Sequence, residues 1–350
     1  MHSPSNHERV QRAPRRHRPS LVLAALAAAL VLAALAGVAL GAVGIAPGEV
    51  AAAIGRAFTG GERGLSDAVV MDLRLPRVVL AAIVGAALAF AGALYQALFR
   101  NALADPYILG VSSGAGLGAT LALALLGTSY AARSLGVTAG AFVGAGLTVL
   151  LVVRLASRAG RVDPNSLLLA GIAISYTLSA LTSFVMVVDR QSMQSIVYWM
   201  MGGLSGRSWE HVGLAGAALA MGAIIPMLGH RDLDLMLLGD ERAGQLGVPV
   251  ERLKMLMLAS ASLMVAGAVS VSGLIGFVGL MTPHMVRLVI GPHHRLLLPA
   301  SALAGAVLLV VADLVARTVL APVEVPVGIV TALAGGPFFV WLLRRSASPR

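Results

Sequence analysis

One run of 32 residues, 255–286, contains no Asp, Glu, Lys or Arg. A helix needs roughly 20 consecutive apolar residues to cross the hydrocarbon core of a bilayer, so this run is long enough for at least one span. Comparable runs without charge recur along the chain, and only a bundle embedded in lipid tolerates them one after another. The chain is therefore predicted to be an all-α polytopic membrane protein.

The composition agrees with this prediction. Of the 350 residues, 58% are hydrophobic and 12% are charged, about half the charged fraction of a typical soluble domain. Many of the 40 glycines lie inside the apolar runs, where small residues let helix backbones approach closely in a membrane. We therefore expect Gly114, Gly116 and Gly118 to mark close helix packing. The absence of cysteine excludes disulfides and thiolate metal ligands.

Ten spans fit the charge-free runs. They are predicted near 21–45, 78–99, 107–126, 134–153, 167–188, 210–229, 255–273, 276–290, 296–318 and 325–343. The first run follows a basic head and also fits a secretory signal peptide, but it is longer than the roughly 7–15 apolar residues of such peptides, so we interpret it as a retained helix. Segment 255–290 is long for one span and short for two, and its glycines and Pro283 favour two short or interrupted segments.

The basic residues predict which ends of the spans lie in the cytoplasm. With the N-terminus inside, 18 of the 26 Lys and Arg residues lie on the cytoplasmic side and 8 lie outside, as the positive-inside rule favours. Both termini are then cytoplasmic, with residues 1–20 as a basic tail and 21–345 as the membrane domain. The net charge of +10 does not indicate nucleic-acid binding, because the basic residues are spread over loops on both sides.

An unusual loop with the sequence Arg74-Leu-Pro-Arg77 lies outside, directly before the second predicted span. Pro76 is expected to begin that helix. The two arginines can anchor lipid headgroups, or they can dock an acidic partner, because guanidinium groups pair bidentately with carboxylates.

The glycine-rich segment 109–118, after an inside hairpin at 99–106, does not predict a nucleotide site. A P-loop needs Gly-Lys followed by Ser or Thr, and the only lysine, Lys254, stands between Leu253 and Met255. We expect this chain to bind no cofactor.

The largest inside loop is 230–254. Asp240, Glu241 and Arg242 can begin a short helix that ends near Gly247. The apolar residues before it are expected to face water: Leu233, Leu235, Met236, Leu237 and Leu238. An exposed apolar patch rimmed by charge indicates an interaction surface, so a cytoplasmic partner is predicted here in preference to a solvated connector.

These loops, in this order, resemble the permease subunits of ABC importers for iron–siderophore complexes, haem and cobalamin. The resemblance covers about 50–345. The matching motifs are Arg-Leu-Pro-Arg77, Arg-Asn-Ala-Leu-Ala-Asp-Pro106, Gly-Val-Ser-Ser-Gly-Ala115, Tyr-Trp-Met-Met-Gly-Gly203, Leu-Gly-Asp-Glu-Arg-Ala-Gly-Gln-Leu-Gly247, Gly-Phe-Val-Gly-Leu-Met-Thr-Pro-His284 and Glu-Val-Pro-Val-Gly-Ile-Val-Thr331. Their order along the chain, more than any one motif, carries the resemblance.

The resemblance implies the fold of a type II importer permease, with ten helices and both termini cytoplasmic in the inner membrane. It implies a transporter subunit that is not an enzyme, because ATP and Mg are bound by two separate cytoplasmic ATPase subunits. The other implied partners are a periplasmic or lipid-anchored substrate-binding protein, a second permease copy as a homodimer or close homologue, and membrane lipid. A ferric siderophore is the first expectation for the cargo, with cobalamin and haem as alternatives.

Roles carried over by position give three sets of candidate residues, and the mechanism that they imply gives a fourth. Binding-protein docking is implied for Arg74, Arg77 and Arg317. ATPase coupling is implied for Asp240, Glu241, Arg242, Ala243, Leu246, Gly247 and Val248. A cytoplasmic gate is implied for Asn101, Leu103, Pro164 and Asn165. The translocation path is expected to include Ser112, Ser113, Ser175 and Ser179.

Two of these interpretations have local alternatives. Arg317 lies four residues after Asp313 on one helical face, so a structural salt bridge stays open beside the docking role. His284 beside Pro283 is interpreted as a satisfied packing residue in preference to a metal ligand, and no metal site is predicted.

Two other functional classes compete with the importer. A secondary transporter normally has ionisable residues within the membrane to bind its coupling ion, and only Asp313, near an outer end, qualifies. An intramembrane enzyme needs a nucleophile with a base or a metal cluster, and no His–Glu spacing of that kind lies within a predicted span.

Overall fold

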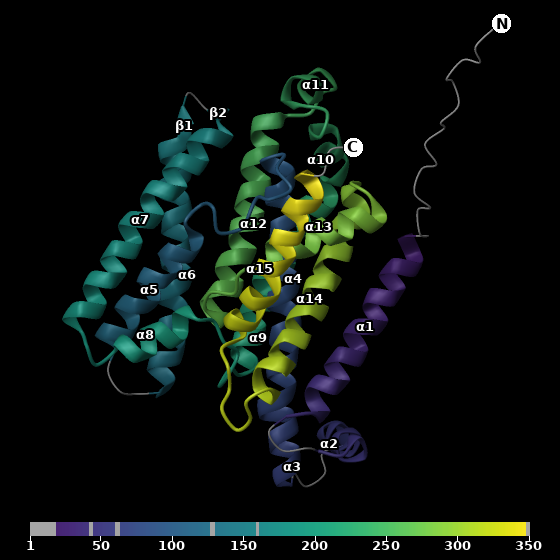
Figure 1. Ribbon diagram of the computed structural model, residues 1–350, viewed down its shortest axis with the longest axis vertical. Coiled ribbons are helices and arrows are strands. Elements are labelled where there is room, and N and C mark those ends of the chain that lie inside the picture. The colour runs from purple at the N-terminus through teal and green to yellow at the C-terminus, as the bar shows by residue number, and fades with distance from the viewer. Residues whose placement is uncertain (1–18, 42–44, 60–63, 127–129, 159–160, 348–350) are drawn as a thin grey trace, which may run out of the picture.

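The computed structural model describes residues 19–41, 45–59, 64–126, 130–158 and 161–347 as a helical bundle (Figure 1). Its helices are α1 Pro19–Ala39, α2 Pro47–Thr59, α3 Leu65–Ala68, the π-helical turn η1 Val69–Arg74, α4 Leu75–Leu98, α5 Val111–Leu125, α6 Tyr130–Ala156, α7 Pro164–Val188, α8 Met193–Met200, α9 Trp209–Leu228, α10 His230–Met236, α11 Asp240–Gln245, α12 Val250–Ser272, α13 Val278–Ile290, α14 His294–Thr318 and α15 Val327–Ala347. Strands β1 Ser157–Arg158 and β2 Arg161–Val162 form a small antiparallel hairpin. The predicted tail 1–20 lies almost wholly outside the described residues.

The all-helical prediction is confirmed, and each predicted span has a helix. Among the described residues, seven helical stretches are long and apolar enough to cross a membrane. Three shorter apolar helices complete the set: Val111–Leu125, Val278–Ile290 and Val327–Val340. The prediction that 255–290 contains two segments is confirmed, because α12 and α13 are separated by a turn in which Gly273 and Phe277 have φ of 69° and 68°.

Helix α4 is the centre of the bundle. It packs against α9, α12, α13 and α14, and every residue from Ala87 to Leu98 is buried. Its two polar side chains there each form a hydrogen bond, although Gln96 Oε1 is buried without a partner. The Tyr95 hydroxyl lies 2.9 Å from Ser262 Oγ, and Gln96 Nε2 donates to the Leu280 carbonyl at 3.0 Å.

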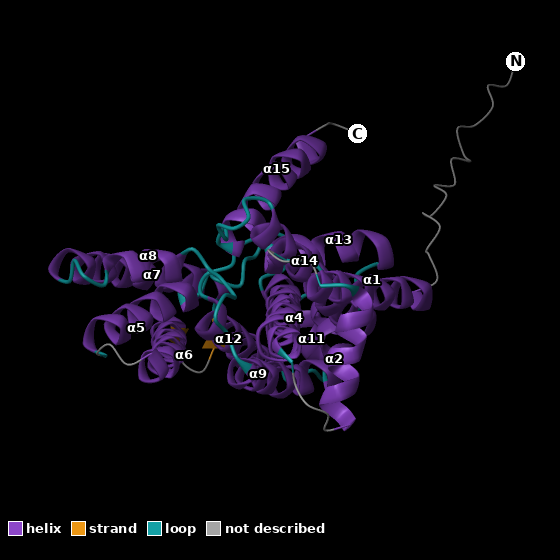
Figure 2. Cartoon of the chain, turned by 90° about the horizontal axis from the view of Figure 1, so that it is seen from below, coloured by secondary structure: helices purple, strands orange, loops and turns teal. Residues whose placement is uncertain are grey.

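A second group of helices lies beside this centre. Helix α5 packs against α6 and α7, and α5 and α6 both reach α12. Figures 1 and 2 show α7 and α8 at the edge of the bundle. Most of the α7 side chains are exposed in the single chain.

Glycines permit the closest helix contacts. A Cβ atom at Gly92 would overlap the carbonyl of Gly279, so α4 and α13 touch through their backbones. Gly114 and Gly118 of α5 likewise face the backbone of α6. The expectation is wrong for Gly116, where a Cβ would meet nothing within 4 Å.

The prediction that Pro76 begins a helix is confirmed for α4, where Pro76 lies in the first turn, but the chain before it is helical as well. A continuous helical stretch runs from Leu65 to Leu98 through α3, η1 and α4. Proline lacks an N–H and normally clashes with the carbonyl four residues before it. The π-helical turn Val69–Arg74 directly before Pro76 widens the hydrogen-bond ladder and so accommodates it.

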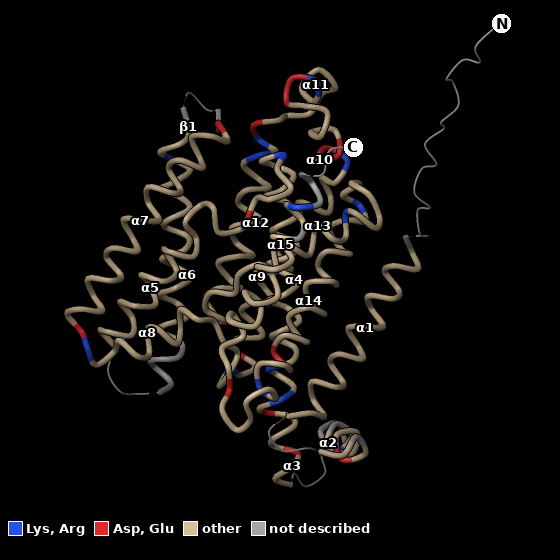
Figure 3. Tube along the Cα trace, viewed as in Figure 1, with Lys and Arg blue, Asp and Glu red and all other residues tan. Residues whose placement is uncertain are grey.

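The bundle has two ends, which we name by their helices. The α11 end contains α10, α11 and the β1–β2 hairpin, and the α8 end contains α2, α3, α8 and residues 319–326 (Figure 1). Figure 3 shows that charged residues gather at these two ends and leave the middle of the bundle almost free of charge. This distribution is the one expected of helices that cross a bilayer.

Candidate functional site

At the α8 end, five charged residues form a cluster that is largely buried apart from Glu324, and we call it the arginine cluster: Arg74, Arg77, Asp313, Arg317 and Glu324. Asp313 of α14 is 1% exposed. Arg77 Nε lies 3.0 and 3.1 Å from its two carboxylate oxygens, and Arg317 Nε lies 3.4 Å from Oδ2. Arg77 also donates through Nη1 to both oxygens of Glu324 at 2.9 and 3.0 Å. One guanidinium thus joins α4 to α14 and to the loop before α15.

The other two arginines of the cluster bind the end of α1. Arg74 Nη1 donates to the carbonyls of Val38 and Ala39 at 2.9 and 3.0 Å, and Arg317 Nη2 donates to the Gly37 carbonyl. The last carbonyls of a helix have no partner within it and carry partial negative charge. The two cations satisfy these groups and fasten α1 to α4 and α14.

The structure brings together the three arginines that the resemblance implies for docking. Their charged groups are engaged within the chain, and Arg74 and Arg317 are 8% and 6% exposed. The salt bridge between Arg317 and Asp313 that the sequence left open is present. Docking of a binding protein by these arginines stays a prediction, with Arg77, whose side chain is 11% exposed, as the most open of them.

Glu324 is the exposed end of the cluster, with a side chain that is 43% exposed. Burial raises the pKa of Glu324, but the hydrogen bonds and the charge of Arg77 outweigh that effect, so the net pKa is lowered. Sequence reasoning gave this residue no role. The sequence could have indicated a role for Glu324, because acidic residues are rare in this chain and this one lies just before a predicted span.

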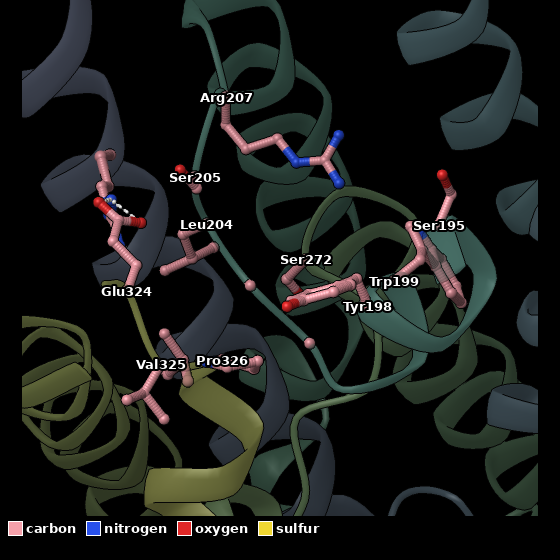
Figure 4. A pocket seen from close by; sticks show the side chains of 14 residues that line it. Ser195, Tyr198, Trp199, Leu204, Ser205, Arg207, Ser272, Glu324, Val325 and Pro326 are labelled. Atoms are coloured by element: carbon pink, nitrogen blue, oxygen red, sulfur yellow. Dashed lines mark hydrogen bonds and ion pairs between the residues drawn. The ribbon is translucent and has the colours of Figure 1, made fainter. Parts of the chain in front are cut away.

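A cavity of about 620 Å³ adjoins Arg77 and Glu324 (Figure 4). Its wall includes Tyr198 and Trp199 of α8, residues 202–205 and Arg207, Ser272 at the end of α12, and residues 324–327. Aromatic, hydroxyl and charged groups from four separate parts of the chain therefore line one space. Such a cavity is large enough to admit part of a bulky solute or a loop of a partner protein.

Three glycines let the segments beside this cavity pack closely. A Cβ at Gly202, which has a φ of 71°, would overlap the Leu274 carbonyl, and one at Gly328 would overlap the Met201 carbonyl. A Cβ at Gly273 would overlap the Trp199 carbonyl. Gly203 N also donates to Ser272 O at 2.8 Å. The loops after α8 and α12 and the start of α15 can meet this closely only because glycine has no side chain.

At the α11 end, α11 has the predicted position and extent. Exposed apolar side chains surround it: Leu237 is 43%, Leu238 53% and Leu246 59% exposed. The expected exposure of Leu233 and Met236 is wrong, because α10 folds onto the bundle and buries both. Ala243 and Val248, two of the implied coupling residues, are also buried and hold α11 against the chain.

The remaining implied coupling residues lie on the surface of this end. Glu241 and Arg242 are exposed, and Gly247 has a φ of 89° at the turn that follows α11. Asp240 forms ion pairs with Arg100 and Lys254. The surface therefore combines exposed leucines with charges of both signs.

The implied gate residues lie in two neighbouring turns. Asn101 Oδ1 accepts from the Leu103 N–H at 2.9 Å, which shapes the hairpin after α4, and both residues are exposed. Pro164 and Asn165 begin α7, and Pro164 shares a small cavity with Phe99 from that hairpin. The two turns are thus close, and gating by them stays a prediction.

The implied path residues are divided between α5 and α7. Ser112 and Ser113 of α5 and Ser175 of α7 are partly buried, whereas Ser179 is exposed on α7. Thr177 and Ser183 donate to carbonyls of their own helix, at 3.0 Å each. Neither helix contains an Asp, Glu, Lys, Arg or His residue.

The interpretation of His284 as a satisfied residue is wrong. Both of its ring nitrogens are buried without a hydrogen-bond partner. Within the described ranges, no group of three or more His, Cys, Asp or Glu residues is arranged to hold a metal ion.

The sequence profile of the FecCD transport family matches residues 21–345. The chain belongs to this family. FecCD proteins are permease subunits of ABC importers for metal chelates, so the chain is a transport subunit and the ATPase is a separate protein. ATPase and substrate-binding partners follow from membership.

Relatives of this FecCD permease have names that specify cargo. It is 47% identical over 276 residues to the cobalamin import system permease protein of Halobacterium salinarum, covering 79% of this chain and 73% of that protein. It is 43% identical to the hemin transport system permease protein of Yersinia pestis, covering 80% and 84%. It is also similar to a solved inward-facing ABC transporter assigned to the metal-chelate type, with a TM-score of 0.82, 30% identity, and coverage of 93% and 99%.

Proposed function

We propose that this FecCD permease forms the translocation path of an ATP-driven importer for a metal chelate, between two copies of the chain. In this proposal the α8 end faces outside and receives a binding protein. The α11 end is cytoplasmic and binds two ATPase subunits. Both termini are then cytoplasmic, since α1 begins and α15 ends toward the α11 end (Figure 1).

The main support for a translocation path along α7 is the position of Tyr176. This residue lies at the midpoint of α7 and is 76% exposed. Tyrosine is enriched at the two membrane interfaces, where its hydroxyl reaches water, and a hydroxyl in hydrocarbon lacks partners. A water-filled path between two copies of α7 removes this penalty. It also explains why exposed Ser179 lies one turn further along the same helix.

The exposed face of α7 makes a prediction for the homodimer. The chain has no cysteine, so Tyr176→Cys and Ser179→Cys each introduce a single thiol. Oxidation in membranes is expected to link these variants into dimers, as seen by non-reducing electrophoresis. Leu35→Cys, on α1 at the opposite side of the bundle and 57% exposed in the wild-type chain, is the control and is expected to stay monomeric. Disulfide-linked dimers of the Leu35→Cys control, with none of the two α7 variants, would contradict a dimer interface at α7.

The cargo class is a metal chelate. Within it, a ferric siderophore is the first candidate, and the names of two relatives support cobalamin and haem as alternatives. The test is ATP-dependent uptake of each compound into vesicles that contain the permease, its ATPase and its binding protein. Uptake of one compound against its gradient, with none by the permease alone, is expected. Concentration of cargo by the isolated permease would refute the proposal.

The exposed leucines around α11 predict the ATPase contact. Leu246→Asp is expected to weaken association with the ATPase about tenfold, because it places a charge in an apolar contact. Copurification in mild detergent measures the effect. Leu65→Asp at the opposite end, where Leu65 is 86% exposed, is the control and should copurify normally. Normal copurification of the Leu246 variant would show that the ATPase does not bind at Leu246.

An ion-coupled secondary transporter is disfavoured by the surroundings of Asp313. Its carboxylate is paired with both Arg77 and Arg317. A coupling site must gain and lose a cation during transport, whereas two guanidinium groups hold this carboxylate in place.

A further inference from the structure

Four charged residues at the α11 end form a second cluster, which we call the Asp240 clasp: Arg100, Asp240, Glu251 and Lys254. Lys254 Nζ lies 2.6 Å from Asp240 Oδ2 and 3.1 Å from Glu251 Oε1. Arg100 Nη2 pairs with the other carboxylate oxygen of Asp240. One carboxylate at the first residue of α11 therefore joins the end of α4 to the first turns of α12.

Lys254 is held in this position by its surroundings. It is the only lysine of the chain, and it is 8% exposed. A buried ammonium is retained only where anions compensate its lost hydration. Its two partners are the carboxylates of Asp240 and Glu251, so displacement of α11 removes one of them.

Arg100 stands at a strained point of the backbone. Its φ is 46°, in the left-handed region that non-glycine residues rarely adopt. It directly precedes the turn in which Asn101 accepts from the Leu103 N–H. Such a conformation persists where surrounding contacts determine it, and the Asp240 ion pair is one contact that does so. The ion pair therefore links Asp240 directly to the residue that precedes the 101–103 turn.

The rest of α11 and the residue that follows it offer an exposed surface to which a partner can bind. Leu246, beyond the last turn of α11, is 59% exposed, whereas Ala243 is fully buried. A partner bound to the exposed side would contact the same short helix that begins with Asp240. The clasp joins that helix to α4 and α12, two helices that pack against each other.

We propose that Arg100 and Lys254 are positioning residues that transmit the displacement of α11, through Asp240, to the turn 101–103 and to α12. This inference rests on the proposed function, in which α11 contacts the ATPase and the turn belongs to the gate. Two roles are thereby assigned to the α11 end. The exposed leucines bind the ATPase, and the Asp240 clasp transmits the displacement of α11 to the 101–103 turn and to α12.

The first test is Arg100→Gln in vesicles that contain the complete importer. Cargo transported per ATP hydrolysed is expected to fall about fivefold, as the loss of a partly exposed pair within a charge network predicts. The ATPase should copurify and hydrolyse ATP as with the wild type. Arg100→Lys keeps the charge and is expected to restore much of the ratio. A wild-type ratio in Arg100→Gln would overturn the proposal.

A double-variant cycle separates transmission from general damage. If Arg100 acts through Asp240, Arg100→Gln combined with Asp240→Asn should reduce the ratio no further than the more severe single variant. Asp72→Asn, an exposed acid at the α8 end, is the matched control and should combine independently with Arg100→Gln. Independent effects of Arg100 and Asp240 would overturn the proposal. Failure of the wild-type permease to bind any ATPase would instead refute the proposed function.

The single lysine provides a direct readout of the clasp. Acetylation of Lys254 by an amine-reactive reagent, measured by mass spectrometry, is expected to be slow in the wild type and severalfold faster in Asp240→Asn. It should also change in rate when the complete importer is trapped with nucleotide. Equal rates in all of these states would show that Asp240 does not hold Lys254, and would overturn the proposal even if a variant folds poorly.

Discussion

Asp313→Asn is expected to lower the free energy of unfolding by about 3–5 kcal/mol, the cost of removing one partner from a buried ion pair. The substitution keeps the size of the side chain but leaves the buried groups of Arg77 and Arg317 without their shared anion. It should also loosen α1, because Arg317 binds the carbonyl of Gly37. Thermal unfolding of the purified permease in detergent measures the loss.

Glu324→Gln is the matched control for this result. Glu324 pairs with the same Arg77, but its side chain is 43% exposed, and exposed pairs contribute about 0–1 kcal/mol. The control is therefore expected to unfold within a few degrees of the wild type. Similar losses for both variants would contradict the assignment of Asp313 as the centre of the arginine cluster.

Gly92→Ala is expected to disrupt the centre of the bundle at a cost of about 3 kcal/mol or more, at or above the upper range for overpacked cores. The added methyl group would overlap the backbone carbonyl of Gly279. A side chain can rotate away from such a clash, but a helix backbone can yield only if α4 and α13 separate. Folded yield from membranes and thermal unfolding in detergent both measure this effect.

Gly116→Ala is the control for the glycine prediction. Gly116 also lies inside an apolar helix, but nothing is within 4 Å of the position of its Cβ. Alanine favours a helix over glycine by about 1 kcal/mol, so the control should be neutral or slightly more stable. Equal loss in both variants would indicate that glycine content, and not helix contact, governs stability.

The positions of the spans could be predicted from the sequence because the bilayer acts on each helix separately. Length and lack of charge are local properties, and they located the ten apolar helices found in the part of the chain that the structure describes, including the break between α12 and α13. The short helix at 240–245 was also predictable, because its acidic start and its glycine end are local signals.

The relations between helices could not be predicted in this way. Arg77 and Asp313 are 236 positions apart, and Arg100 and Asp240 are 140 apart. The family resemblance implied an external partner for Arg77 and the ATPase for Asp240. Only the fold shows that both are engaged within the chain. Gly118 likewise faces the backbone of α6, whereas a Cβ at Gly116 would meet nothing within 4 Å. The pattern of small residues in the sequence does not distinguish the two positions.

The amino-acid sequence by itself therefore determined that this is a helical membrane protein, where its spans lie, and through ordered motifs which family it resembles. These properties follow from the transfer of each segment into hydrocarbon, which depends on that segment alone. The tertiary structure decided which charges neutralise one another and which surfaces remain open to partners. Those outcomes depend on distances between remote segments, and electrostatic and packing energies become large only when the folded chain brings the groups into contact.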